Sequence, residues 1–182
     1  MMTAATMDIQ AILEARALAL AQPLTDASVA EGEVRLVVLQ LGEEQYALRS
    51  EWVEEVQPLG RITPVPGLAR HWCGLVNLRG RLFPVLDLQL YLVDIGLLHT
   101  RAAATGEQRI VLVTAAGLTI ALLVDDVPAV RGVAQAAIEP SLVEAQGALN
   151  AVLPGITADL LAILDLPAMF ADQRLSVGAK SL

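Results

Sequence analysis

Aromatic side chains are scarce, since Phe, Trp and Tyr together make up only 3% of the 182 residues. The core must therefore be filled by Val, Leu, Ile and Ala, and the Val-rich stretches favour strands over helices. Hydrophobic residues reach 55% and charged residues only 18%, which excludes a disordered chain. No apolar run approaches the roughly 18 uncharged residues that a membrane helix requires. We expect a globular, mostly β protein without direct membrane insertion.

Cysteine and positive charge are also limited. The single Cys73 cannot form an internal disulfide, and the N-terminus lacks the basic segment, apolar run and cleavage site of a secretory signal. Both features are typical of a cytoplasmic protein. The 12 Lys and Arg residues face 20 Asp and Glu residues, which gives a net charge of −8. Nucleic acid is not an expected partner, because phosphate contacts need clustered Lys and Arg.

Residues that carry catalysis or bind metals are few. Cys73 and His71 form the one candidate nucleophile pair, and on a strand their side chains would share a face. The pair has no orienting third group, and Cys in an apolar stretch is more often an inert buried residue. His99 has no partner, the spacings of a zinc site are absent, and the glycines form no phosphate loop. We expect no catalytic residue, no metal site and no cofactor.

The chain contains an internal repeat. Residues 34–56 align without a gap with residues 108–130. Identical pairs in this alignment include Arg35 with Arg109, Ala47 with Ala121, Leu48 with Leu122, Val53 with Val127 and Val56 with Val130. Further on, Leu86-Asp87-Leu88 matches Leu164-Asp165-Leu166. The matching segments follow the order A-B-A′-B′, which predicts two similar units related by internal duplication.

Each half supplies four or five short strands separated by Gly, Pro or Asp, a pattern that favours a small barrel over a helical bundle. The expected strands are Arg35 to Leu41, Gln45 to Arg49, Cys73 to Leu78, Leu82 to Leu86, Arg109 to Thr114, Thr119 to Val124, Ala129 to Val133 and Leu160 to Leu164. The expected helices are an N-terminal one, Met7 to Leu20, and two short ones at barrel ends, Gln89 to Val93 and Pro167 to Asp172.

This pattern predicts three parts of the chain. Residues 1–32 form the N-terminal helix and a connector, residues 33–172 form the main domain, and residues 173–182 form a C-terminal tail. The domain consists of two five-stranded barrel subdomains, roughly residues 33–100 and 101–172. An exchange of strands between the subdomains is left open.

Several segments, taken in order, resemble the CheW-like family of bacterial chemotaxis signalling. They are Leu41 to Leu48, Val53 to Val56, Ile62 to Pro66, Gly74 to Leu88 and Val124 to Val127, within a similarity that covers about residues 33–172. The resemblance implies two SH3-like barrels and no catalytic activity. It also implies an adaptor that joins the cytoplasmic tips of methyl-accepting chemoreceptors to the regulatory domain of a CheA-like histidine kinase in membrane-associated arrays.

The resemblance implies partner contacts at Glu55 and Arg79. We expect Asn77 and Gly80 to take the positive φ of a tight turn, so that Arg79 projects from a rigid corner, where its planar guanidinium suits an interface. A turn arginine that only pairs with Glu55 is the alternative. The candidate partner-binding residues are Val53, Glu55, Val56, Asn77, Arg79, Gly80, Phe83 and Pro84.

Four further expectations concern single segments. Val53 and Val56, three apart, are expected to face the core from a helical turn. Phe83 and Pro84 are expected on an edge strand that is open to a partner strand. Trp72 is expected to pack between the barrels, and the pair Asp125 and Asp126 to lie at a solvated strand end rather than in a metal site.

A function of another class is also compatible with the sequence. The chain would then be an SH3-like ligand-binding or hydrolytic module with a pocket between the barrels. The acidic composition and the missing acid-base or metal cluster favour the adaptor.

Overall fold

The computed structural model describes residues 32–103, 106–141 and 151–175, which lie in a compact unit that begins at Gly32. The predicted helix from Met7 to Leu20 lies outside the described residues, as does most of the predicted tail. No helix in the described ranges is long and apolar enough to cross a membrane.

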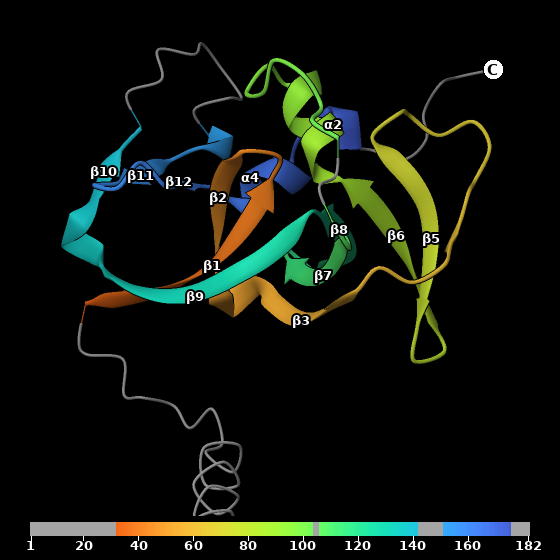
Figure 1. The fold of residues 1–182 in the computed structure, drawn as a ribbon, viewed down its shortest axis with the longest axis horizontal. Helices are drawn as coiled ribbons and strands as arrows, with labels where there is room; N and C mark the ends of the chain where they lie inside the picture. Colours follow the sequence, from red (N-terminus) through yellow and green to blue (C-terminus); the bar gives the residue numbers. More distant parts are fainter. Residues whose placement is uncertain (1–31, 104–105, 142–150, 176–182) are drawn as a thin grey trace, which may run out of the picture. The chain divides into compact units, whose positions relative to one another are not determined.

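The described strands form two six-stranded sheets (Figure 1). Sheet A runs in the order β10 (Ile138–Pro140), β11 (Gly155–Thr157), β12 (Ala162–Ile163), β2 (Glu44–Arg49), β1 (Glu33–Leu41) and β9 (Asp126–Ala134). Sheet B runs in the order β3 (Val53–Pro58), β7 (Arg109–Ala115), β8 (Leu118–Val124), β6 (Arg81–Asp87), β5 (Trp72–Leu78) and β4 (Ile62–Thr63). The remaining elements are the helices α2 (Leu88–Asp94) and α4 (Leu166–Phe170) and the 3-10 turns η1 (Ser50–Trp52), η2 (Gln135–Ala137) and η3 (Gln173–Leu175).

The mostly β architecture with two sheet units is confirmed, but the sheets differ from closed five-stranded barrels. Each has six strands, and among the described residues its two end strands are not hydrogen-bonded to each other. The extra strands are short or solvated on one face, so their hydrophobic pattern is weak: β3, β4, β10 and β11 were not predicted. The predicted last strand is also shorter, because Leu160 lies in a turn before β12.

The internal repeat is visible in the sheet topology. Ile163 of β12 pairs in parallel with Ala47 of β2, and Val85 of β6 pairs in parallel with Ala121 of β8, the residue that aligns with Ala47. The sheets therefore have the same strand order, with β1 to β6 corresponding to β7 to β12.

The first hairpin of each half lies in the sheet of the other half. Hairpin β1–β2 is in sheet A with β9 to β12, and hairpin β7–β8 is in sheet B with β3 to β6. The boundary between subdomains near residue 100 and the exchange of strands between them stay predictions.

The core consists of three hydrophobic clusters. A central cluster between the sheets contains residues of both, such as Leu39 of β1 and Val111 of β7. Sheet B curls around a second cluster that includes Ile110, and sheet A curls around a third that includes Leu36 and Val38. Strands β1, β7 and β8 bury both faces in this way, which explains the continuous apolar runs Leu36 to Leu39, Ile110 to Val113 and Ile120 to Val124 within them.

The two short helices follow β6 and β12 directly. Asp87 caps α2 by accepting a hydrogen bond from the Leu90 N–H (3.0 Å), and Asp165 caps α4 by accepting one from the Ala168 N–H (2.8 Å). The Asp of the Leu-Asp-Leu motif therefore caps the following helix in both halves. Both helices bury their apolar side in the central cluster.

Candidate docking surface

The hairpin between β5 and β6 carries the predicted arginine corner. Leu78 pairs with Arg81, so the reversal consists of Arg79 and Gly80 alone, with φ values of 52° and 82°. Two consecutive positive φ values are the mark of a type I′ turn, whose twist matches that of the strands. Asn77 is not among the residues of positive φ; instead its side-chain oxygen accepts a hydrogen bond from the Gly80 N–H at 2.9 Å. The expected reversal is present, but Arg79 has the positive φ that we expected for Asn77.

Arg79 forms an ion pair with Glu55 of β3. Its Nη2 lies 2.7 Å from Oε1 of the carboxylate, and the side chains are 81% and 26% exposed. Strand β3 is an end strand of sheet B, and the hairpin belongs to strands near the opposite end of that sheet. The ion pair therefore spans the gap between the two ends of sheet B, which we call its seam. We call Glu55, Val56, Arg79 and Gly80 the first corner.

The valines beside Glu55 do not lie on a helical turn. Val53 and Val56 belong to β3, which pairs with β7 through a bulge between Val53 and Glu55. Val53 packs against the central cluster, while Val56 is 40% exposed. A spacing of three places two side chains on opposite faces of a strand, and the burial along β3 alternates accordingly. Val56 is consequently available to a partner and Val53 is largely not.

Phe83 and Pro84 are not on an edge strand. Strand β6 lies between β5 and β8, and Phe83 is buried in the cluster of sheet B with the Arg81 guanidinium 5.0 Å from its ring centre. The parallel pairing with β8 begins only at Val85, so the missing N–H of Pro84 leaves no ladder position empty. The edge strand next to the first corner is β3.

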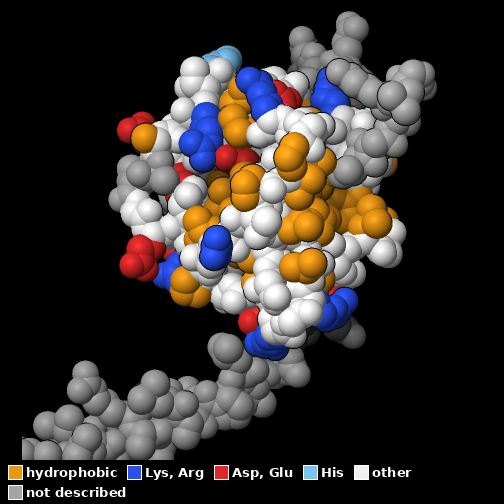
Figure 2. Space-filling model, turned by 90° about the vertical axis from the view of Figure 1, so that its right-hand side faces the viewer, with side chains coloured by type: hydrophobic (Ala, Val, Ile, Leu, Met, Phe, Trp, Pro, Cys, Tyr) orange, Lys and Arg blue, Asp and Glu red, His pale blue; other side chains and the backbone are white. Residues whose placement is uncertain are grey.

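An apolar face extends from the β5–β6 side of the molecule (Figure 2). Leu82 and Leu118 are 65% and 54% exposed. Their exposure could not be predicted, because alternation places both on the same sheet face as buried residues. A groove of about 320 Å³ lies here, lined by Trp72, Pro84, Leu118, Thr119, Ile120, Phe170 and Leu175. None of these side chains titrates near neutral pH or is a usual nucleophile apart from a threonine. The face suits contact with another protein rather than chemistry.

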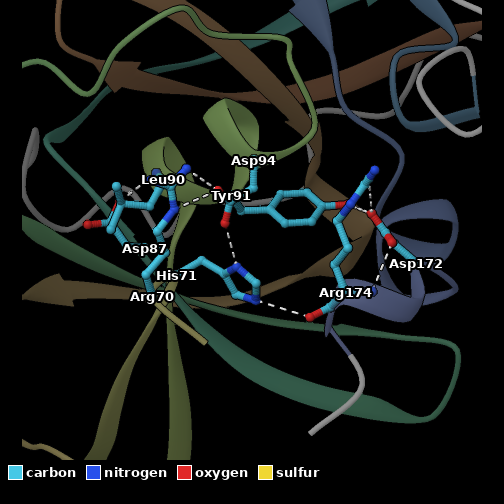
Figure 3. A network of polar contacts seen from close by, with 8 residues as sticks. All are labelled: Arg70, His71, Asp87, Leu90, Tyr91, Asp94, Asp172 and Arg174. Atoms are coloured by element: carbon cyan, nitrogen blue, oxygen red, sulfur yellow. Dashed lines mark hydrogen bonds and ion pairs between the residues drawn. The ribbon is translucent and has the colours of Figure 1, made fainter. Parts of the chain in front are cut away.

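A buried polar network holds the entrance to β5 (Figure 3). His71 is 3% exposed, with Nδ1 at 2.8 Å from Asp94 Oδ2 and Nε2 at 3.1 Å from the carbonyl oxygen of Arg174. Arg70 also pairs with Asp94. Burial opposes ionisation of Asp94, but hydrogen bonds from Arg70 and His71 outweigh it and lower the pKa of this carboxyl below its ordinary value of 3.8. Both nitrogens of His71 are thus engaged in joining β5 to α2 and η3.

Cys73 lacks the environment of a nucleophile. Burial, followed by the negative charge of Asp87, raises the pKa of its thiol, although Arg101 opposes the shift. A reactive cysteine needs the opposite shift, toward the thiolate. Trp72, between these two residues, packs against the central cluster as expected.

Asp125 is buried rather than solvated. Its Oδ2 accepts hydrogen bonds from the Gly42 N–H (2.6 Å) and from Gln89 Nε2 (2.7 Å), and its Oδ1 accepts one from Gln108 Nε2 (3.4 Å). Only Asp126 is exposed, where it pairs with Arg109. Three donors occupy its oxygens, and Asp125 thereby connects the β1–β2 turn to sheet B.

Comparisons with known proteins agree with this fold. A family model described as CheW-like domain matches residues 35–174. The chain is 29% identical over 113 residues to the chemotaxis protein CheW of Bacillus subtilis (strain 168), which covers 62% of this chain and 69% of that relative. Its structure is similar to the crystal structure of the scaffolding protein TtCheW from Thermoanaerobacter tengcongensis, with a TM-score of 0.65 and 29% identity over 78% of this chain and 94% of that one. Because the family model spans most of the chain and the sheets have the matching arrangement, this chain belongs to the CheW-like family.

Proposed function

We propose that this chain couples methyl-accepting chemoreceptors to a CheA-like histidine kinase, and that the first corner is one of its docking surfaces. Family membership and the similarity to a scaffolding protein support an adaptor. The observation that carries the assignment of the surface is Arg79, an 81% exposed arginine held at a positive φ.

The geometry of Arg79 suits an interface anchor. A two-residue turn fixes its backbone, and the hydrogen bond of Asn77 to Gly80 fixes the turn. Within the described residues its guanidinium donates to Glu55 alone, so most of its N–H groups are available to a partner. Arginines with a fixed backbone lose less freedom on binding and are frequent among the residues that dominate binding energy.

Polar and apolar groups surround this arginine. Glu55 supplies a negative charge beside it, and the exposed Val56 supplies apolar area. Such a mixed surface, with a charge pair that sets orientation, is typical of a protein interface. Association with membrane-bound receptor arrays would then occur through partners.

The alternative, a ligand-binding or hydrolytic module with a pocket between the barrels, receives less support. Two grooves of the described residues are each lined by strands of one sheet only. Strands of sheet B line the apolar groove near Trp72, together with Phe170 of α4 and Leu175 of η3, and strands of sheet A line one of about 260 Å³ that includes Arg49 and Asp165. The space between the sheets is filled by the central cluster. An adaptor needs no such pocket.

The test measures binding of the cognate kinase regulatory domain and of a receptor-tip fragment by isothermal titration calorimetry. Arg79→Glu should weaken at least one complex by about 1–3 kcal/mol. The double variant Glu55→Arg/Arg79→Glu is the matched control, because it restores an ion pair across the seam with reversed polarity. It should fold like the original chain and still bind weakly. Unchanged affinity of both fragments for Arg79→Glu would exclude the first corner as a docking surface.

A further inference from the structure

Leu160 occupies a conformation that leucine rarely adopts. The Thr157 N–H donates to the Leu161 carbonyl at 3.0 Å and so closes a three-residue loop, residues 158–160, at whose end the Leu160 N–H donates to the Thr157 carbonyl at 2.9 Å and the φ of Leu160 is 62°. Glycine is the usual residue at this position of such a loop. The side chain is also 78% exposed, the most exposed large hydrophobic residue of the described ranges. Leu160 is therefore unfavourable in both backbone and solvation, which points to a role outside the fold.

The neighbours of Leu160 form a charged and apolar surface. Asp159 Oδ2 lies 2.7 Å from Arg131 Nη1 of strand β9, and the two side chains are 58% and 40% exposed. The Thr157 hydroxyl donates a hydrogen bond to Asp159 at 2.5 Å, which fixes the carboxylate. Val130, next to Arg131, is 62% exposed. We call Val130, Arg131, Asp159 and Leu160 the second corner.

The second corner is the counterpart of the first. Strand β9 corresponds to β3, hairpin β11–β12 corresponds to β5–β6, and Val130 aligns with Val56. In both sheets a hairpin tip with a non-glycine residue at positive φ is joined by an ion pair to the end strand. Both sheets therefore have an ion pair between a hairpin tip and an end strand, although the strand residues differ in position, since Glu55 aligns with Ala129 and Arg131 aligns with Gln57.

The charges of the two corners are reversed. At the first corner the hairpin supplies the cation, Arg79, and the strand supplies the anion, Glu55. At the second corner the hairpin supplies the anion, Asp159, and the strand supplies the cation, Arg131. A protein surface that is complementary to one corner places like charges against the other, and this mismatch selects between partners.

We propose that the second corner is a separate docking surface for a second protein, one that offers an apolar recess to Leu160 and a cationic side chain to Asp159. The proposal rests on the proposed adaptor function, which requires the chain to hold two partners. It explains why an exposed leucine stands where glycine would relieve the backbone. It also gives a function to the reversed polarity of the two ion pairs.

The test compares two matched substitutions. Leu160→Gly removes the side chain and relieves the backbone at the second corner. Ala116→Gly does the same in the β7–β8 turn, where exposed Ala116 has a φ of 49° and lies outside both corners. Neither variant should lower the midpoint of thermal unfolding. Leu160→Gly alone should weaken one of the two fragments, kinase regulatory domain or receptor tip, at least tenfold, and that fragment should be the one whose binding survives Arg79→Glu.

Each other outcome contradicts the proposal. Unchanged binding of both fragments to Leu160→Gly would show that the leucine anchors neither. Loss of the same fragment in Leu160→Gly and Arg79→Glu would merge the two corners into one surface. Self-association of the chain that disappears only in Leu160→Gly would make a second copy the occupant. If the unmodified chain binds neither fragment, the proposed function itself fails and this proposal fails with it.

Discussion

Replacing Arg79 by glycine separates a binding role of this arginine from a folding role. A non-glycine residue in the left-handed region costs about 1–2 kcal/mol, which glycine relieves. The greater freedom of glycine in the unfolded chain removes roughly 0.5–1 kcal/mol of that gain. Loss of the ion pair with Glu55 costs about 0.2–0.5 kcal/mol, because Arg79 is 81% exposed. The sum lies between a loss of about 0.5 and a gain of about 1 kcal/mol in the free energy of unfolding.

Urea denaturation and titration calorimetry on the same preparation measure both effects. The unfolding midpoint should therefore hardly move, while affinity for the fragment that uses the first corner should fall by about 1–3 kcal/mol, or roughly 5- to 150-fold. Arg79→Ala is the control, since it keeps the strained backbone and should be slightly less stable than Arg79→Gly. A loss of more than about 2 kcal/mol of stability in Arg79→Gly would refute the reasoning. It would show that the ion pair with Glu55 is needed to hold the two ends of sheet B together, so that Arg79 has a folding role.

Three further predictions concern the interior. Asp125→Ala should cost about 3 kcal/mol or more in urea denaturation, since it leaves the Gly42 N–H and the Gln89 amide without their acceptor; a loss under about 1 kcal/mol would mean that these donors find other partners. The lowered pKa of Asp94 means that its carboxylate stabilises the folded state at neutral pH, so the stability difference from Asp94→Asn should be constant well above pH 3.8 and shrink as the pH falls below that value. A difference that grows on acidification would contradict the assignment. Cys73, with its raised pKa, should react with a disulfide reagent at pH 8 more slowly than free cysteine, and faster reaction would favour the hydrolytic alternative.

Strands that bury both faces were predictable from the sequence. Strand β8 contains an apolar run, Ile120 to Val124, whose every position is buried, and its predicted start at Thr119 is one residue from the observed Leu118. The repeat could be recognised for the same reason: buried positions such as Ala47 and Ala121 pair in equivalent registers and tolerate little change in size. The resemblance to the CheW-like family rests on a different observation, the order of segments such as Ile62 to Pro66 and Gly74 to Leu88.

The errors lie where long-range pairing decides the conformation. The spacing of Val53 and Val56 fits a helical turn, but the segment is a strand because it pairs with residues 109–113, far along the chain. Pro84 read as an edge residue, since no local pattern shows that pairing with β8 starts one position later. Leu160 was assigned to a strand because it is apolar, whereas its hydrogen bonds place it in a turn. The local sequence indicated most of the strands and helices, whereas the strand that each one pairs with was known only from the structure.

The reciprocal placement of the first hairpins constrains how the chain can assemble. During synthesis from the N-terminus, β1 and β2 emerge first, yet their neighbours β9 and β12 lie in the second half. Sheet B has all of its strands once β8 has emerged, whereas the β1 edge of the earliest hairpin waits for β9, which ends at Ala134, and its β2 edge waits for β12, which ends at Ile163. A ribosome that stalls between β8 and β12 would therefore leave hairpin β1–β2 with an unpaired strand edge, which favours aggregation.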